Sequence, residues 1–177
     1  MKTYDLVVIG GGSGGLSAAI SAFDNGVKNI LVLEKESYLG GILLQCIHNG
    51  FGLHTFKEEL TGPEYADRFV KELHKRNIEY KVDSFVSEIS QKEKDFVVTY
   101  SNKVDGYVSA KAKSIVCATG CSERNRGEIS LQGYRPSGVM TAGTAQKYLN
   151  IEGYLVGKNV FILGSGDIGL IMARRMK

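Results

Sequence analysis

The feature that most constrains this sequence is a glycine turn between an apolar run and a helix-like segment. Residues 4–9 read YDLVVI and lead directly into GGGSGG. A short apolar run bounded by glycines is typical of a strand buried on both faces of a parallel sheet. A helical pattern over residues 16–23 ends at Asn25-Gly26, and a second apolar strand is expected at Ile30–Leu33. This order predicts a βαβ unit.

Three glycines of the first turn, Gly10, Gly12 and Gly15, have the spacing G-x-G-x-x-G. The first permits a tight turn, the second lets the backbone approach a pyrophosphate, and the third lets helix and strand pack closely. Glu34 ends the second strand, where it can accept hydrogen bonds from a ribose and repel a 2′-phosphate. The pattern predicts dinucleotide binding; a turn built for packing and a solvated strand end are the alternatives.

A second turn of the same form lies near the end of the sequence. Gly164, Gly166 and Gly169 follow an expected buried strand at Asn159–Leu163 and open an expected helix near Asp167. Asp167 is also explained as an acidic residue favoured by the positive end of a helix. The next strand, whose acid or arginine would separate NAD from NADP, is not part of the sequence, so a competent second site is not assured.

The segment between the turns is expected to be rich in strands. Residues 35–62 are irregular, and a helix is expected from Thr61-Gly62-Pro63 with an apolar stripe at Tyr65, Phe69 and Leu73. The pattern then changes towards period two, which predicts strands. These are Glu79–Val82, Phe85–Ile89, Phe96–Tyr100, Tyr107–Ala112 and Ser114–Ala118. A linker at Ser122–Ser137 and a short helix at Thr141–Leu149 complete an α/β pattern.

Composition excludes several classes of function. With 177 residues, 43% of them apolar and 23% charged, the chain suits one or two globular domains. The net charge of only +3 gives no support for nucleic-acid or membrane-surface binding. The N-terminus is not a signal peptide, and no apolar run approaches the roughly 18 residues of a membrane span. Three cysteines without metal-ligand spacing, Cys46, Cys117 and Cys121, indicate a reduced, cytoplasmic protein without a metal site.

Two such turns, separated by a β-rich insertion and by Ala118-Thr119-Gly120, resemble the pyridine nucleotide-disulphide oxidoreductase superfamily, whose members are flavoproteins with two dinucleotide-binding domains. The resemblance implies a Rossmann-like FAD-binding domain over residues 1–150, with a parallel sheet, helices and a small antiparallel β insertion. Residues 151–177 would be the first strand and helix of a second Rossmann unit, the NAD(P)H-binding domain.

The resemblance also assigns cofactor-binding residues by position. For the ADP part of FAD they are Gly10, Gly12, Ser13, Gly14, Gly15, Glu34 and its neighbour Lys35. The doublet Gly40-Gly41 matches the turn beside the flavin, and Val86 matches a position whose backbone meets adenine. Ala118, Thr119 and Gly120 match the motif that ends the strand passing the cofactor. For NAD or NADP the implied residues are Gly164, Gly166, Asp167 and Gly169.

A narrower resemblance involves GILLQCIHNGFG and the stretch from GTAQKYLN to IMARR. These are similar to a subgroup without redox disulphides, which includes FAD/NAD(P)-binding subunits of opine and dye-linked proline dehydrogenases and hydrogen cyanide synthase. The positions of the redox cysteines in disulphide reductases correspond to Leu43 and His48, or to residues 142–145, which read AGTA. A dithiol relay needs two exchanging thiols, so disulphide reductase activity is not expected.

The implied activity is that of an FAD-dependent NAD(P)H oxidoreductase. Hydride would pass between nicotinamide and flavin, and electrons would pass to a small-molecule substrate or a partner dehydrogenase subunit in a hetero-oligomer. Catalytic residues are not identified; Cys46, His48 and His54 are expected to face the flavin or to be structural. The missing C-terminal segment suggests an N-terminal fragment with exposed apolar residues around Val160 and Ile168. A non-catalytic nucleotide-binding or assembly module is the alternative.

Overall fold

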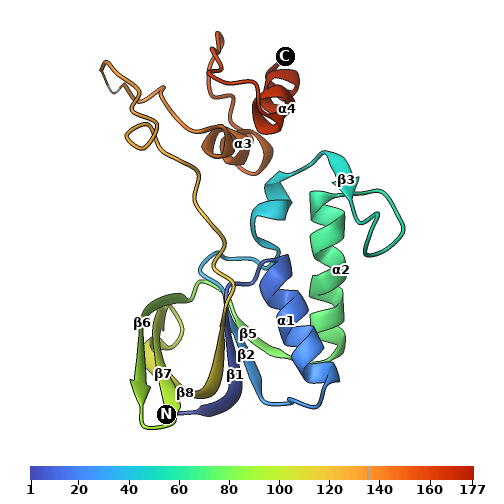
Figure 1. The fold of residues 1–177 in the computed structure, drawn as a ribbon, viewed down its shortest axis with the longest axis vertical. Helices are drawn as coiled ribbons and strands as arrows, with labels where there is room; N and C mark the ends of the chain where they lie inside the picture. Colours follow the sequence, from blue (N-terminus) through green and yellow to red (C-terminus); the bar gives the residue numbers. More distant parts are fainter. Residues whose placement is uncertain (135) are drawn as a thin grey trace. The chain divides into compact units, whose positions relative to one another are not determined.

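The computed structural model describes residues 1–134 and 136–177 (Figure 1). They form two compact units. The first unit comprises Met1–Leu43 and Pro63–Gly120, and the second unit comprises Leu44–Gly62 and Cys121–Lys177. The expected linker Ser122–Ser137 is almost entirely exposed and contains no helix or strand over its described residues; residue 135 lies outside them.

The first unit contains a six-stranded sheet with the order β5-β2-β1-β8-β7-β6. Its strands are β1 (Thr3–Ile9), β2 (Ile30–Leu33), β5 (Glu79–Lys81), β6 (Phe85–Lys92), β7 (Asp95–Asn102) and β8 (Gly106–Cys117). The neighbours β5, β2, β1 and β8 pair in parallel, whereas β8, β7 and β6 pair antiparallel. The expected α/β fold, with a Rossmann-like parallel sheet and an antiparallel β addition, is confirmed.

Both faces of the central strands are buried, as their continuous apolar runs predict. In β1, Val7 packs in one core cluster and Val8 in another, because successive side chains of a strand point to opposite faces. The helices α1 (Ser13–Asp24) and α2 (Gly62–Lys75) lie side by side over the face that includes Val8 (Figure 1). Leu73 of α2 is fully buried there, so the expected apolar stripe is oriented towards the sheet.

The strand β8 is longer than expected. Two strands are predicted at Tyr107–Ala112 and Ser114–Ala118, but Gly106–Cys117 is continuous. Its first part pairs with β7 and its later part pairs with β1, so one strand joins the antiparallel and parallel parts of the sheet. The lysines that suggested a break are accommodated at the surface, where Lys113 Nζ lies 2.7 Å from an Asp5 carboxylate oxygen.

The second unit contains short elements. The 3₁₀ helix η1 (Gly41–Gln45) leads into it, and β3 (Asn49–Phe51) pairs antiparallel with β4 (Leu60–Thr61). The helices α3 (Ala142–Asn150) and α4 (Asp167–Met176) contact each other. Both helices were expected from the sequence, and the second begins at the predicted residue.

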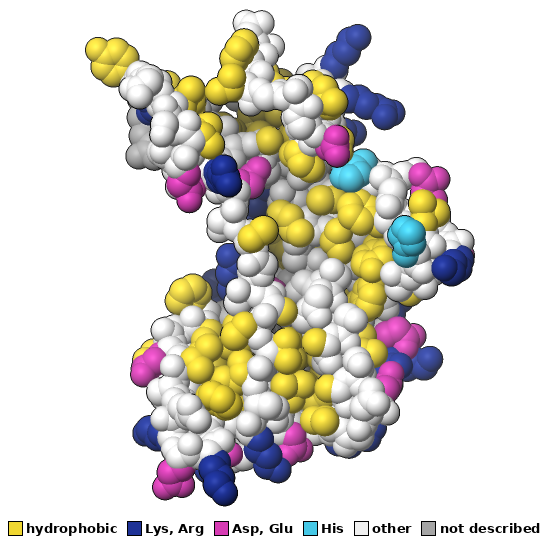
Figure 2. Space-filling model, viewed as in Figure 1, with side chains coloured by type: hydrophobic (Ala, Val, Ile, Leu, Met, Phe, Trp, Pro, Cys, Tyr) yellow, Lys and Arg dark blue, Asp and Glu magenta, His cyan; other side chains and the backbone are white. Residues whose placement is uncertain are grey.

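The predicted strand at Asn159–Leu163 is wrong. This segment is neither helix nor strand, and Phe161 and Leu163 have 89% and 67% of their surfaces exposed. A parallel strand requires hydrogen-bonding neighbours, and none of the described strands pairs with this segment. Apolar side chains consequently lie at the surface of the second unit (Figure 2), as expected for Val160 and Ile168.

Candidate dinucleotide-binding site

The first glycine turn joins β1 to α1 and is packed too tightly for side chains. Gly10 has a φ of 109°, and its amide donates a hydrogen bond to the Leu33 carbonyl at 2.8 Å. A Cβ atom on Gly10 would lie 2.2 Å from the Ala118 carbonyl oxygen, and one on Gly15 would lie 1.9 Å from the Gly10 carbonyl oxygen. Both glycines are therefore required by close backbone packing, as the motif predicts.

The N-terminus of α1 is left open. Gly12 is the N-cap residue, and no side chain of the described residues caps the helix. By contrast, Thr141 caps α3 by accepting a hydrogen bond on Oγ1 from the Thr144 amide. The first amides of a helix lack partners within the helix and attract anions. The first turn of α1 also contains no acidic residue, so it suits a phosphate.

The glycine doublet at the end of the loop after β2 lies against this turn. Gly40 donates a hydrogen bond from its amide to the Gly11 carbonyl at 2.8 Å and forms a parallel bridge with Gly12. Gly41 has a φ of 62°, and a Cβ atom there would lie 2.9 Å from the Gly12 Cα. Two motifs that are distant in sequence thus meet through bare backbone.

Glu34 has a structural contact that sequence reasoning missed. Its side chain is buried, and Oε2 accepts a hydrogen bond from the Gly11 amide at 2.6 Å while Oε1 accepts one from the Glu36 amide at 2.9 Å. A Cβ atom on Gly11 would lie 2.6 Å from Leu39 Cδ2. The only sequence signal for this contact was the third consecutive glycine. The carboxylate therefore fastens the glycine turn to the end of β2.

The connection from β5 to β6 runs beside Glu34. The Glu34 amide donates to the Lys81 carbonyl at 2.9 Å, and the Ser84 amide donates to the Glu34 carbonyl at 2.8 Å. Ser84 is 2% exposed and was not expected to matter. Val86 follows in β6, where it is partly buried and adjoins an irregularity in the pairing with β7.

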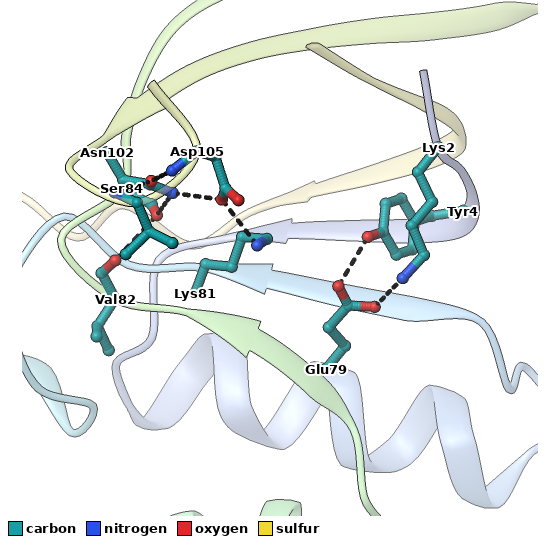
Figure 3. Close-up of polar contacts among 9 residues, drawn as sticks. Lys2, Tyr4, Glu79, Lys81, Val82, Ser84, Asn102 and Asp105 are labelled. Atoms are coloured by element: carbon teal, nitrogen blue, oxygen red, sulfur yellow. Dashed lines mark hydrogen bonds and ion pairs between the residues drawn. The ribbon is translucent and has the colours of Figure 1, made fainter. Parts of the chain in front are cut away.

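Side chains from the β7–β8 turn contact this connection (Figure 3). Asn102 Nδ2 donates to Ser84 Oγ at 3.0 Å and to Asp105 Oδ2 at 2.9 Å, while Ser84 Oγ donates to the Val82 carbonyl at 2.9 Å. Lys81 Nζ donates to Asp105 Oδ2 at 2.8 Å. This bond lowers the pKa of Asp105 and raises the pKa of Lys81.

A second polar group lies along the same strand (Figure 3). Glu79 accepts a hydrogen bond from Lys2 Nζ at 2.5 Å and one from the Tyr4 hydroxyl at 3.0 Å. Burial is the main reason that the pKa of Tyr4 is raised to about 12. These contacts tie β5 to the start of β1.

The remaining residues assigned to FAD are also part of the first unit. The Ala118 amide donates to the Ile9 carbonyl at 2.8 Å, so Ala118, Thr119 and Gly120 leave β8 directly beside the glycine turn. Ser13 and Gly14 form the start of α1, and Lys35 is exposed next to Glu34.

The second glycine turn belongs to the second unit. Gly164 has a φ of 120°, and Gly166 caps α4 with extended backbone, like Gly10 and Gly12 in the first turn. A Cβ atom on Gly169 would lie 3.4 Å from the Gly164 carbonyl oxygen, which is a looser approach than at the first turn. Asp167 is the first residue of α4 and is exposed.

The thiols and histidines suggest no redox pair. Cys46, Cys117 and Cys121 are not in disulphide bonds, and burial raises the pKa of the Cys46 thiol. His48 Nδ1 lies 3.0 Å from the Asn49 carbonyl oxygen, and His54 is exposed. No group of metal-ligating side chains is found among the described residues. None of their helices is long and apolar enough to cross a membrane.

Comparisons with known proteins agree with this geometry. Residues 4–177 match the family model described as pyridine nucleotide-disulphide oxidoreductase. A thioredoxin reductase of Helicobacter pylori is 30% identical over 164 residues, which cover 92% of this chain and 49% of the relative. An opine oxidase subunit of Agrobacterium tumefaciens is 28% identical over 181 residues, with 98% and 34% covered.

Among solved structures, L-proline dehydrogenase from P. horikoshii has the same fold, with a TM-score of 0.77 at 20% identity; 98% of this chain and 34% of that chain are covered. The chain thus spans between a third and a half of the length of these relatives. With a family model that matches almost every residue and a glycine turn of the expected geometry, the chain belongs to the pyridine nucleotide-disulphide oxidoreductase family.

Proposed function

We propose that this chain supplies the FAD-binding part of an FAD-dependent NAD(P)H oxidoreductase that works without a redox-active disulphide. The observation that carries the proposal is the first glycine turn, where Gly10 and Gly15 admit no side chain and the N-terminus of α1 has no side-chain cap. Such a turn presents main-chain amides to a diphosphate. Flavoproteins of this family use FAD and NAD(P).

The residues present fit the ADP part of FAD. The diphosphate would lie across the amides of Gly12, Ser13, Gly14 and Gly15. Each oxygen of the Glu34 carboxylate accepts one main-chain amide, and a carboxylate oxygen can accept more than one hydrogen bond. Glu34 would therefore accept ribose hydroxyls without releasing the turn.

The other assignments follow the position of each motif. Lys35 would lie near the ribose, and the backbone of Val86 would meet adenine. Gly40 and Gly41 would lie beside the flavin, as would Ala118, Thr119 and Gly120, which follow β8. In this assignment residues 1–150 belong to FAD binding, and residues 151–177 begin the NAD(P)H-binding domain. Gly164, Gly166, Asp167 and Gly169 would face NAD or NADP.

When bound, the flavin would supply the redox chemistry, taking hydride from the nicotinamide and passing electrons to an acceptor. The residues of this chain would bind and orient the cofactor. The similarity to opine oxidase subunits supports a hetero-oligomer in which a partner dehydrogenase is the acceptor. The absence of a dithiol at Leu43 and His48, or at residues 142–145, supports a route without disulphide exchange.

Absorption spectroscopy of the purified chain tests this proposal. We expect a flavin spectrum after incubation with FAD and desalting, and loss of that absorption when NADH is added. A chain that retains neither FAD nor ADP would refute it.

A non-catalytic nucleotide-binding or assembly module is the second candidate. The exposure of Phe161 and Leu163 favours it, because the second turn lacks the sheet on which a dinucleotide domain is built. This candidate predicts FAD or ADP binding without bleaching by NADH.

A further inference from the structure

The connection between β5 and β6 holds the main chain of Glu34 from both sides. The Glu34 amide donates to the Lys81 carbonyl, and the Glu34 carbonyl accepts from the Ser84 amide. Two residues beyond Glu34, the chain is fastened again, because the Asp83 amide donates to the Glu36 carbonyl at 2.8 Å. The location of the Glu34 backbone is thus set by residues 81–84.

This connection has an irregular conformation that needs support. Asp83 has a φ of 50°, which an L-residue adopts only when its surroundings enforce it. Ser84 follows it and is almost completely buried. Its hydroxyl donates to the Val82 carbonyl and accepts from Asn102 Nδ2, so that the side chain spans the bend.

Asn102 is the centre of the supporting network (Figure 3). Its Oδ1 accepts hydrogen bonds from the amides of Val104 at 3.0 Å and Asp105 at 2.6 Å, while its Nδ2 donates to Ser84 and Asp105. All the side-chain hydrogen-bonding capacity of one amide is therefore spent on shaping the β7–β8 turn and on holding Ser84.

We propose that Asn102 and Ser84 are positioning residues that set the Glu34 carboxylate for the ribose of an adenine nucleotide. They act through the backbone of Glu34 and do not touch the ligand themselves. The inference rests on the proposed function, because it takes Glu34 as the ribose acceptor. It adds that discrimination between ribose and 2′-deoxyribose depends on the β7–β8 turn.

Calorimetric titration of the full chain with ADP and with 2′-deoxy-ADP tests the proposal. We expect the wild-type chain to prefer ADP by about ten-fold or more, as for a hydrogen bond to a charged group. Asn102→Ala and Ser84→Ala should each reduce this preference by about three-fold or more, as expected for members of one hydrogen-bond network. Val104→Ala, whose side chain is 92% exposed in the same turn, should leave it unchanged.

Hydrogen exchange of the Gly11 amide gives a readout without ligand. This amide donates to Glu34 Oε2, so displacement of the carboxylate should accelerate its exchange in Asn102→Ala and in Ser84→Ala, but not in Val104→Ala. The double variant should resemble either single variant, because both remove the same contact.

The outcomes separate the two proposals. Loss of affinity for ADP and 2′-deoxy-ADP by the same factor, with Gly11 protection unchanged, would show that Asn102 and Ser84 only stabilise the fold and would overturn the positioning role alone. A folded wild-type chain that binds neither nucleotide would overturn both the positioning role and the proposed function. If one variant fails to fold, the other variant and the exchange of Gly11 still decide the question.

Discussion

Replacing Glu34 by glutamine should destabilise the first unit although the two side chains have nearly the same shape. Both carboxylate oxygens accept a main-chain N–H group, one from Gly11 and one from Glu36. Glutamine offers one oxygen and one NH₂ group, so one of these two amides must face a donor. The substitution exchanges two hydrogen bonds to a charged acceptor for one hydrogen bond to a neutral acceptor.

The size of the effect follows from these contacts. A hydrogen bond to a charged group contributes about 1.5–3 kcal/mol, and a buried donor left unpaired costs about 1–3 kcal/mol. Since the Gly11 residue is buried, we expect Glu34→Gln to lower the free energy of unfolding by about 2–3 kcal/mol. Urea denaturation followed by circular dichroism measures this quantity.

Glu88→Gln is the matched control, because Glu88 is exposed on β6 and the chemical change is identical. Its effect should stay within about 0.5 kcal/mol. The reasoning is refuted if Glu34→Gln and Glu88→Gln have equal effects on the unfolding free energy.

Three further outcomes test other parts of the structure. Gly10→Ala should abolish soluble expression, because its Cβ would overlap a backbone carbonyl, whereas Gly26→Ala has open space and should cost only about 1–2 kcal/mol in a urea titration. Arg76 lowers the pKa of Asp24, so this pair stabilises the fold above the unfolded-state pKa and ceases to do so as the pH falls through the lower folded-state pKa; Asp24→Asn should therefore reduce the loss of stability on acidification between pH 5 and pH 2, measured by thermal melts. Phe161→Ser should change the unfolding free energy by less than about 0.5 kcal/mol, because the ring is 89% exposed; a loss comparable to a core truncation would contradict the exposed segment.

The first βαβ unit could be predicted from the sequence because its signals are local. The run at residues 4–9, the glycines and the strand at Ile30–Leu33 each specify backbone geometry without help from distant residues. The same reasoning failed at Asn159–Leu163, because an apolar run becomes a strand only where another strand offers hydrogen-bonding partners. Its composition is similar to that of β1, but its surroundings are not.

The contacts of the candidate site were less accessible to sequence reasoning. The glycine spacing and Glu34 identified which residues to watch, yet the bond from the Gly11 amide to Glu34 depends on how two loops meet. Ser84 and Asn102 have no distinctive spacing, and each looks like an ordinary turn residue. Their importance comes from burial and from bonds across the sheet, which no periodic pattern encodes.

The continuity of β8 has a consequence for how faithfully the first unit assembles. Since β8 is aligned against β1 on one side and β7 on the other, its register is specified twice. A slip by one residue would turn every side chain of the strand to the opposite face and would break both alignments together. The hairpin formed by β7 and β8 therefore acts as a gauge: its turn at residues 103–105 dictates, from the far end of the strand, that Ala118 arrives beneath Gly10.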